Sequence, residues 1–276
     1  GGVVDDLPLQ VGQRDRVVVD DAERAAIVNA HIARIEEVNP AINALVADRF
    51  TAARAEAQSL ERELRSERSE RSGALPLAGV PFTVKEMISV SGMPHTFGCR
   101  NREGRRATLD ATVVARLRAA GAIVLGVSNV PEWGMWFESF NALYGRTNNP
   151  WSAARTCGGS SGGEGALVGA GGSVFGLGTD IGGSVRMPAA FCGVYAHKPS
   201  HGMLPLTGTF PVYADESTAS QRSPYLTIGA FARSPADLAL LLRVMAGIDG
   251  VDPNARGVTL HDSERVEWRG RRVVLL

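Results

Sequence analysis

The stretch CGGSSGGEGALVGAGGSVFGLGTDIGGSVRMP, which runs from Cys157 to Pro188, is the most distinctive part of this sequence. Glycine-flanked serines, Ser160–Ser161 and Ser184, lie toward its two ends, and most of the residues between them are small. Glycine lets a backbone approach a ligand closely or adopt a positive φ, but it loses more conformational entropy on folding than any other residue. A stretch so rich in glycine therefore predicts a site built largely from main chain.

The segments around this stretch alternate between strand and helix patterns. Residues 78–87, AGVPFTVKEM, predict a short apolar strand that carries one lysine. Residues 110–127, DATVVARLRAAGAIVLGV, predict a helix, a glycine stop and a buried strand. Inside the glycine-rich stretch we expect a helix over about 164–170 and a strand near 173–177. Such units build a mixed, mostly parallel central sheet flanked by helices, so the expected fold class is α/β.

Helices are also expected before and after these units. Apolar residues spaced i, i+4, i+7 from Val28 to Ile35 follow a capping pair at Asp20–Asp21, and we expect this helix to end at Asn39–Pro40. A second helix is expected from about 50 to 65. Residues 226–250 predict a strand and then a helix that starts at Ser234–Pro235 and stops at Gly247.

The chain shows no repeat of 20–50 residues and no low-complexity linker, so we expect one domain over 1–276. It would have a helical N-terminal region at about 20–70 and an α/β core at about 76–276. The final RRVVLL looks like the start of a strand without the turn that normally follows. We therefore expect that the C-terminal part of a larger protein is absent.

Composition limits the classes of partner. Lys plus Arg and Asp plus Glu both number 29, so no overall charge attracts nucleic acid or an anionic membrane. No signal peptide or membrane-spanning run is visible, although the start GGVV leaves trimming open. Cys99, Cys157 and Cys192 form no CxxC pair or Cys/His ligand spacing. We expect a cytoplasmic protein with no metal and no other cofactor, and we leave a homodimer open.

The serines admit several interpretations. Ser160 or Ser161 satisfies the loose G-x-S-x-G pattern of a nucleophile elbow, but His197 and His201 follow too soon for the usual α/β-hydrolase order, and His261 lies in a polar stretch. A phosphate-binding P-loop needs a lysine that is missing between Glu86 and Ala196. A dinucleotide fingerprint fails because Ile181 stands where the third glycine belongs. A serine–lysine arrangement remains.

At this point the sequence resembles a known family. The segments PFTVKEM (81–87), GGSSGGEGALVGAGG (158–172) and GLGTDIGGSVRMPAAFCGVYAHKPS (176–200) are similar to the amidase signature family, and most similar to its fatty-acid amide hydrolase branch of the second type. Further similar segments extend the resemblance from about Ile27 to about Gly247. Family members are considerably longer than this chain, which is a departure from the family pattern.

The resemblance implies a catalytic triad of Lys85, Ser160 and Ser184, which lie 75 and 24 residues apart along the chain. Ser184 would be the nucleophile, and Ser160, at a cis peptide bond, would bridge it to Lys85. The main-chain amides of Ile181, Gly182, Gly183 and Ser184 would form the oxyanion hole. Supporting roles, without chemistry, are expected for four neighbours: Ser161, Thr179, Asp180 and Arg186.

Lys85 must be neutral to accept a proton. Lowering the pKa of a lysine from about 10.4 to about 7 costs about 4.6 kcal/mol, which burial can supply. Phe82, Val84 and other apolar neighbours suit this, although Glu86 would oppose it if it faced the same way. Ser184 would then attack an amide carbonyl and form an acyl-enzyme, and the reverse relay would protonate the leaving amine.

The substrate is less constrained. The resemblance places Met135, Trp136 and Phe137 near the site, where they could line an acyl channel, but core packing explains them nearly as well. We expect a small-molecule carboxylic amide, with fatty-acid or other hydrophobic amides favoured. Two alternatives stay open: a glutaminase-type subunit of a tRNA transamidation complex, and a catalytically silent fragment or scaffold.

Overall fold

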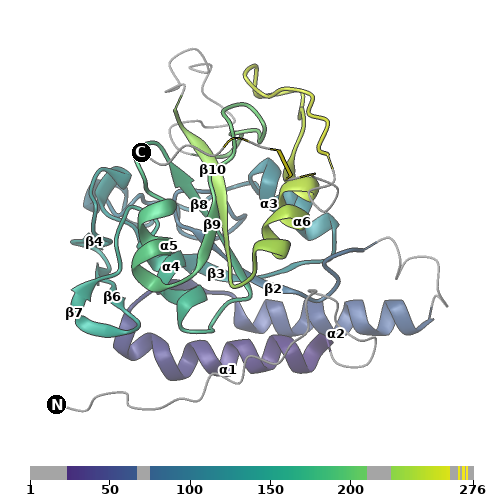
Figure 1. Cartoon of the computed structure of the whole chain (residues 1–276). Coiled ribbons are helices and arrows are strands. Elements are labelled where there is room, and N and C mark those ends of the chain that lie inside the picture. Colours follow the sequence, from purple (N-terminus) through teal and green to yellow (C-terminus); the bar gives the residue numbers. More distant parts are fainter. Residues whose placement is uncertain are drawn as a thin grey trace.

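The computed structural model describes residues 24–66, 75–209, 225–261, 267, 269–270 and 272. At its centre lies a six-stranded sheet in the order β1-β3-β2-β8-β10-β9 (Figure 1). Its strands are β1 (Leu45–Asp48), β2 (Pro81–Lys85), β3 (Ile123–Ser128), β8 (Phe175–Asp180), β9 (Tyr195–His197) and β10 (Thr227–Ala232).

The sheet is mixed, as expected, but its parallel part is smaller than the sequence suggested. β2 pairs in parallel with both β3 and β8. The pairings toward the two edges, β1 with β3, β8 with β10 and β10 with β9, are antiparallel. The expectation of a mostly parallel sheet is therefore correct for the three central strands and wrong for the edges.

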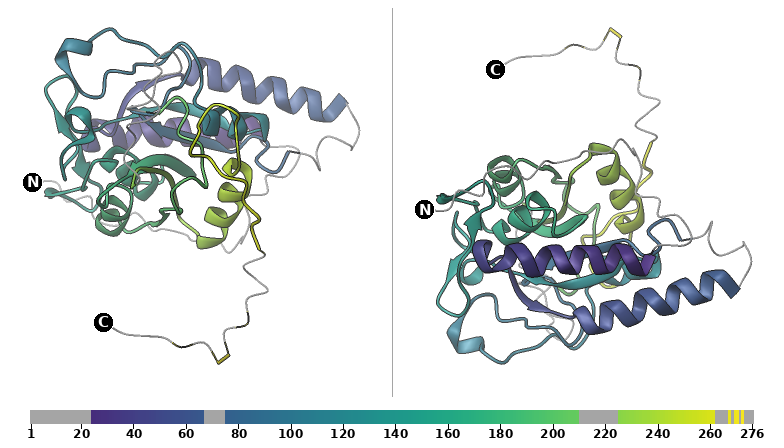
Figure 2. Two further views of the ribbon diagram at one scale, coloured as in Figure 1. Left: turned by 90° about the horizontal axis from the view of Figure 1, so that it is seen from above. Right: turned by 90° about the horizontal axis from the view of Figure 1, so that it is seen from below.

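Helices cover both faces of the sheet, which gives three layers (Figures 1 and 2). One face packs apolar side chains against α3 and α6, and the other packs against α1, α2, α4 and α5. In both views of Figure 2, the long helices α1 and α2 run side by side. The helices are α1 (Arg24–Ile42), α2 (Phe50–Ser66), α3 (Thr112–Ala119), α4 (Gly162–Gly169), α5 (Arg186–Cys192) and α6 (Pro235–Met245).

The residues of β2 show how the sheet separates apolar packing from chemistry. Side chains alternate between the two faces of a strand. Phe82 and Val84 belong to the core between the sheet and α3 and α6, where Phe82 stacks on Phe175 with ring centroids 4.8 Å apart. Thr83 and Lys85 therefore point to the opposite face, toward α4, and both are fully buried. Two polar side chains inside the protein need polar partners, which the site provides.

Most of the predicted helices form where expected. The second helix, the helix–glycine–strand unit at 110–127 and the helix that starts at Ser234–Pro235 are confirmed, and the Ser234 hydroxyl accepts the Ala236 N–H as an N-cap. The predicted end of α1 is wrong, because the helix continues past Pro40 to Ile42. The Asn39 side chain then binds the chain beyond it by accepting the N–H groups of Ala44 and Leu45. The capping pair at Asp20–Asp21 lies outside the described residues.

The aromatic segment 130–151 contains short pieces of regular structure. It begins with a 3₁₀ turn, η3 (Glu132–Gly134), and a further 3₁₀ turn, η2 (Arg100–Arg102), precedes it in the chain. Two small hairpins follow: β4 (Phe140–Asn141) with β5 (Gly145–Arg146), and β6 (Asn148–Asn149) with β7 (Ser152–Thr156). The final RRVVLL lies almost entirely outside the described residues. Among the described helices, none combines the length and the apolar character that a membrane span requires.

Candidate active site

Lys85 is the last residue of β2, and its side chain is completely buried. Its Nζ atom is hydrogen-bonded to Ser160 Oγ at 2.7 Å and to Thr179 Oγ1 at 2.8 Å. Ser160 comes from the loop before α4, and Thr179 is the penultimate residue of β8. The fold thus brings together Lys85 and Ser160, which lie 75 positions apart in the chain.

Burial lowers the pKa of Lys85 to about 7, against the charges of Asp180 and Glu164, which act to raise it. The direction agrees with the expectation from the sequence. Glu86 does not act on Lys85, because its carboxylate faces another loop and accepts hydrogen bonds from the main-chain N–H groups of Thr96 and Phe97. A lysine with a pKa near 7 can gain or lose its proton near physiological pH, which is the property that a general base needs.

The loop that carries Ser160 is closely packed. The peptide bond between Gly159 and Ser160 is cis, as the resemblance predicts. A Cβ at Gly159 would lie 2.7–2.8 Å from the main chain of residues 136–138, so a larger residue does not fit there. Ser139, also buried, accepts the Gly162 N–H at 2.8 Å and donates to the Gly158 carbonyl at 3.2 Å. Ser139 thus braces the loop on both sides of Ser160.

Ser161 connects the two serine loops. Its N–H donates to the Ser184 carbonyl at 3.1 Å. Its hydroxyl donates to the Thr179 carbonyl at 3.2 Å and accepts the Thr179 N–H at 3.3 Å. These contacts agree with the supporting role expected for Ser161. Among the described residues the Ser184 hydroxyl makes no hydrogen bond to Ser160, so the two serine loops are joined by the main-chain bond between Ser161 and Ser184.

Asp180 organises the turn that carries Ser184. Its buried carboxylate accepts the N–H groups of Gly183 at 2.9 Å and Val185 at 3.0 Å, and the Arg186 guanidinium binds both of its oxygens. Burial acts to raise the pKa of Asp180, but the hydrogen bonds from Arg186 and the main-chain amides outweigh it and lower the pKa to about 2. Asp180 and Arg186 thus hold the loop, as predicted.

One part of the predicted oxyanion hole needs correction. The Gly183 N–H points to Asp180, so this amide is not free to bind a substrate oxygen. The amides of Ile181, Gly182 and Ser184 have no acceptor among the described residues, and Ile181 and Gly182 are exposed. Gly183 instead supplies the turn itself, with φ of 122°, a conformation that side chains rarely adopt.

Comparisons with known proteins identify the family of this chain. A family model described as Amidase matches residues 26–273. This chain belongs to the amidase family. Two relatives are fatty-acid amide hydrolase 2-B of Danio rerio, 45% identical over 237 residues, and fatty-acid amide hydrolase 2 of Homo sapiens, 47% identical over 225 residues. These alignments cover 85% and 80% of this chain but 43% and 41% of the relatives, so the chain spans less than half of their length.

Other members of the family are also similar. The crystal structure of a bacterial aryl acylamidase matches with a TM-score of 0.76 and 33% identity over 86% of this chain and 47% of that chain. The A subunit of glutamyl-tRNA(Gln) amidotransferase from Zea mays is 38% identical over 87% of this chain and 42% of that protein. The family thus contains hydrolases and a transamidation subunit, and the family alone does not choose between them.

The predicted substrate segment borders the site through its main chain. A Cβ at Gly134 would lie 3.5 Å from Ser160 Oγ and closer still to Met87, so this loop runs directly over the bridging serine. The side chains that follow are exposed: Met135 by 76%, Trp136 by 64% and Phe137 by 57%. Core packing therefore does not explain them. They form an apolar surface beside the Ser160 loop.

Sequence reasoning underestimated several polar residues. Thr179 was expected to have only a supporting role, yet it binds Lys85 directly. Glu164, within the segment GGEGA, and Ser139 were not considered as site residues. For Glu164 the sequence did carry a signal, because it is a charged residue among small and apolar neighbours in α4. No group of three or more His, Cys, Asp or Glu side chains in the described ranges is placed to hold a metal ion.

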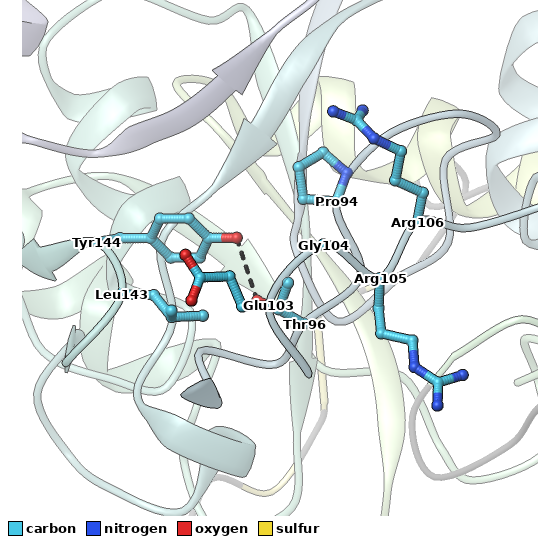
Figure 3. A pocket seen from close by; sticks show the side chains of 8 residues that line it. All are labelled: Pro94, Thr96, Glu103, Gly104, Arg105, Arg106, Leu143 and Tyr144. Atoms are coloured by element: carbon cyan, nitrogen blue, oxygen red, sulfur yellow. Dashed lines mark hydrogen bonds between the residues drawn. The ribbon is translucent and has the colours of Figure 1, made fainter. Parts of the chain in front are cut away.

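A separate small pocket of about 170 Å³ lies next to the loop at 94–106 (Figure 3). Its lining includes Thr96 and Tyr144, whose hydroxyls are 3.1 Å apart, and Glu103. Figure 3 shows the side chains of Arg105 and Arg106 directed to opposite sides. None of the predicted site residues lines this pocket, so it is not part of the candidate active site.

Proposed function

We propose that this chain carries the catalytic centre of a serine amidohydrolase, which cleaves a carboxylic amide to an acid and an amine or ammonia. The observation that carries the proposal is the buried contact of 2.7 Å between Lys85 Nζ and Ser160 Oγ, beside a Ser184 turn in which three amides have no acceptor among the described residues. A buried lysine whose pKa lies near 7 is a suitable base for a hydroxyl relay.

In the proposed mechanism the neutral Lys85 amine takes the proton of the Ser160 hydroxyl, and Ser160 takes the proton of Ser184. The Ser184 Oγ atom bonds to the amide carbon, and the carbonyl π electrons move to oxygen. The free amides of Ile181, Gly182 and Ser184 are suited to stabilise that oxyanion. When the C–N bond breaks, the proton returns through Ser160 to the leaving nitrogen. Water then repeats the relay and releases the acid.

The supporting contacts fit these roles. A neutral amine has one lone pair and two N–H groups. If its lone pair accepts the Ser160 proton, an N–H can donate to Thr179 Oγ1, 2.8 Å away, which fixes the direction of the lone pair. Asp180 is fully occupied by Arg186 and main-chain amides, so its role is to shape the Ser184 turn.

For the substrate, we favour a fatty-acid or other hydrophobic amide. The exposed apolar side chains of Met135, Trp136 and Phe137 next to the Ser160 loop support this preference, because an alkyl chain lying on them would remove apolar surface from water. Identity to fatty-acid amide hydrolases over most of this chain points the same way.

The test uses this chain of 276 residues and an alkyl fluorophosphonate, which reacts with activated serines. We expect labelling at Ser184 in the unchanged protein and none in Ser184→Ala. A panel of p-nitroanilides from acetyl to long fatty acyl then measures amide turnover, which should rise with acyl length. Full turnover in Ser184→Ala would overturn the mechanism. Absence of labelling in folded, unchanged protein would support a catalytically silent fragment instead.

A second candidate is the glutaminase of a tRNA transamidation complex, which the match to glutamyl-tRNA(Gln) amidotransferase A subunits supports. Ammonia release from glutamine, measured with and without added partner subunits, separates the two. Glutamine turnover above that of every p-nitroanilide would favour this candidate, whereas fatty-amide turnover without glutamine turnover would exclude it.

A further inference from the structure

The mechanism above does not use Glu164, a buried charged group on the helix that packs over β2. It lies in the first turn of α4 and is 0% exposed. Its Oε2 atom accepts a hydrogen bond from Thr83 Oγ1 at 2.7 Å, while Oε1 has no hydrogen-bond partner in the described chain. The carboxyl fits only because residue 176 is glycine, since a Cβ there would overlap Oε2. Gly176 thus leaves the space that the Glu164 carboxyl occupies.

Glu164 faces the same side of the sheet as Lys85. Thr83, which binds Glu164, lies two residues before Lys85 on β2, so both side chains point toward α4. Ser128 is the β3 partner of Lys85 in register, and its buried hydroxyl acts to lower the pKa of Glu164. A polar cluster of Thr83, Lys85, Ser128 and Glu164 is therefore enclosed between the sheet and α4.

Lys85 and Glu164 influence each other without forming an ion pair. Burial lowers the pKa of Lys85 to about 7, and the charge of Glu164 acts to raise it. Burial raises the pKa of Glu164 to about 8, against the hydroxyls of Ser128 and Thr83 and the charge of Lys85. The hydrogen bonds made by the Lys85 amine go to Ser160 and Thr179.

The other charged groups near Lys85 are already committed. Asp180 on β8 is held by Arg186 at the start of α5 and by main-chain amides, and its pKa is near 2, so it stays ionised throughout the working range. Glu86, next to Lys85 in sequence, faces Thr96 and Phe97. Lys85 and Glu164 are therefore the two groups of this cluster whose protonation changes together near neutral pH.

Two buried groups that share one proton can exist as an ammonium and a carboxylate or as an amine and a carboxylic acid. The charged form requires desolvation of both ions, and without direct contact their attraction does not offset it. The uncharged form avoids this cost. We propose that Glu164 is a positioning residue for the base of the proposed amidase: it remains a neutral carboxylic acid while Lys85 is the free amine, and its later ionisation strengthens Lys85 as a base.

This inference rests on the proposed function and makes a specific statement about pH dependence. Strongly coupled groups titrate in macroscopic steps that belong to the pair. Activation of Ser184 should therefore rise with pH in two overlapping steps in the unchanged protein. With a permanently neutral group at 164, the second step is lost because no later ionisation strengthens Lys85, so the profile has one step and its overall midpoint lies at lower pH.

The experiment measures the second-order rate constant for fluorophosphonate labelling of Ser184 from about pH 5 to about pH 10. For Glu164→Gln we expect a single ionisation with its midpoint lower by about one pH unit and labelling retained at high pH. A profile that coincides with that of the unchanged protein would overturn the proposal. So would loss of labelling at every pH in a folded variant, because the neutral form would then be insufficient.

Two further variants keep the outcome clear. Thr83→Val removes a hydrogen bond that lowers the pKa of Glu164, so the second step of the labelling profile should move to higher pH while the first step stays in place. An unchanged second step in this variant would overturn the proposal even if Glu164→Gln does not fold. Glu86→Gln, a second buried carboxyl that faces away from Lys85, should leave the midpoint where it is. If the unchanged protein is not labelled at Ser184, the proposed function fails; if it is labelled and only the shift is missing, this inference alone fails.

Discussion

The two serine loops of the candidate site differ in how much of their polar surface is already satisfied. Around Ser160, the bridging hydroxyl binds Lys85, the next residue binds the other loop, and Ser139 braces both sides. Around Ser184, residues 181 and 182 are exposed and three amides have no acceptor in the described chain. The loop around Ser160 is thus assembled without a ligand, while the turn around Ser184 retains donors that a ligand could satisfy. Substitutions in the two loops and around them test this difference.

The largest effect should come from removing the base or either serine. Lys85→Ala, Ser160→Ala and Ser184→Ala should each reduce amide turnover by about 10³-fold or more, because the three groups act as a unit. Single-turnover rates with a p-nitroanilide substrate measure the loss. Combining two of these substitutions should add little, and clear additivity would argue against a shared relay. Circular dichroism confirms that each variant is folded.

Breaking the support of the Ser184 turn should have the next largest effect. Asp180→Asn removes a buried charge that accepts bonds from Arg186 and three amides, and we expect a loss of about 2–3 kcal/mol in the free energy of unfolding. The Gly183 amide would also lose its charged acceptor. Urea denaturation measures the stability change. Arg186→Ala serves as a matched control on the exposed side of the pair and should cost less, since its side chain is 54% exposed.

The lowered pKa of Lys85 should make both the activity and the free energy of unfolding depend on pH. Because its pKa is lowered to about 7, activity should fall about tenfold per pH unit well below that value, as the amine becomes protonated. Unfolded lysine keeps its proton to about pH 10.4, so between these values the unfolded state binds more protons than the folded state. Between about pH 7 and pH 8 this effect is offset by Glu164, which keeps its proton in the folded state only. Above about pH 8 stability should therefore rise with pH, by about 1.4 kcal/mol per pH unit.

Lys85→Met tests the same point on stability alone. The variant should lose this contribution to the pH dependence and be more stable than the unchanged protein near pH 7, because no charge has to be neutralised on folding. Urea titrations at pH 7 and pH 9 give the slope for both proteins. An unchanged slope in Lys85→Met would show that Lys85 is not the group responsible.

The smallest effect is expected at the exposed apolar surface. Trp136→Ala and Phe137→Ala should change the free energy of unfolding by no more than about 0.5 kcal/mol, because the side chains are largely exposed. If they line the acyl path, labelling by a long-chain fluorophosphonate should slow several-fold while labelling by a short-chain one does not. Equal effects on both probes would remove these residues from substrate binding. Leu109→Ala, exposed by 63%, is the matched control.

Much of the site could be predicted because its residues are carried by local motifs. Glycine spacing around Ser160 and Ser184 and the lysine in β2 were recognisable without coordinates, and the contact between Lys85 and Ser160 is present in the structure. The edges of the sheet could not be predicted in the same way. Strand direction there depends on long-range pairing, such as that between β8 and β10, which no local pattern encodes.

The sequence by itself determined which residues can do chemistry, since side-chain type and glycine placement are local properties. Tertiary structure alone decided how they are used. It turned Glu86 away from Lys85, directed the Gly183 amide to Asp180 and enclosed Glu164 beneath the base. The reason is that burial and hydrogen-bond direction depend on packing between segments far apart in the chain. These two factors set the pKa of a group and decide whether its donors and acceptors remain available to a ligand.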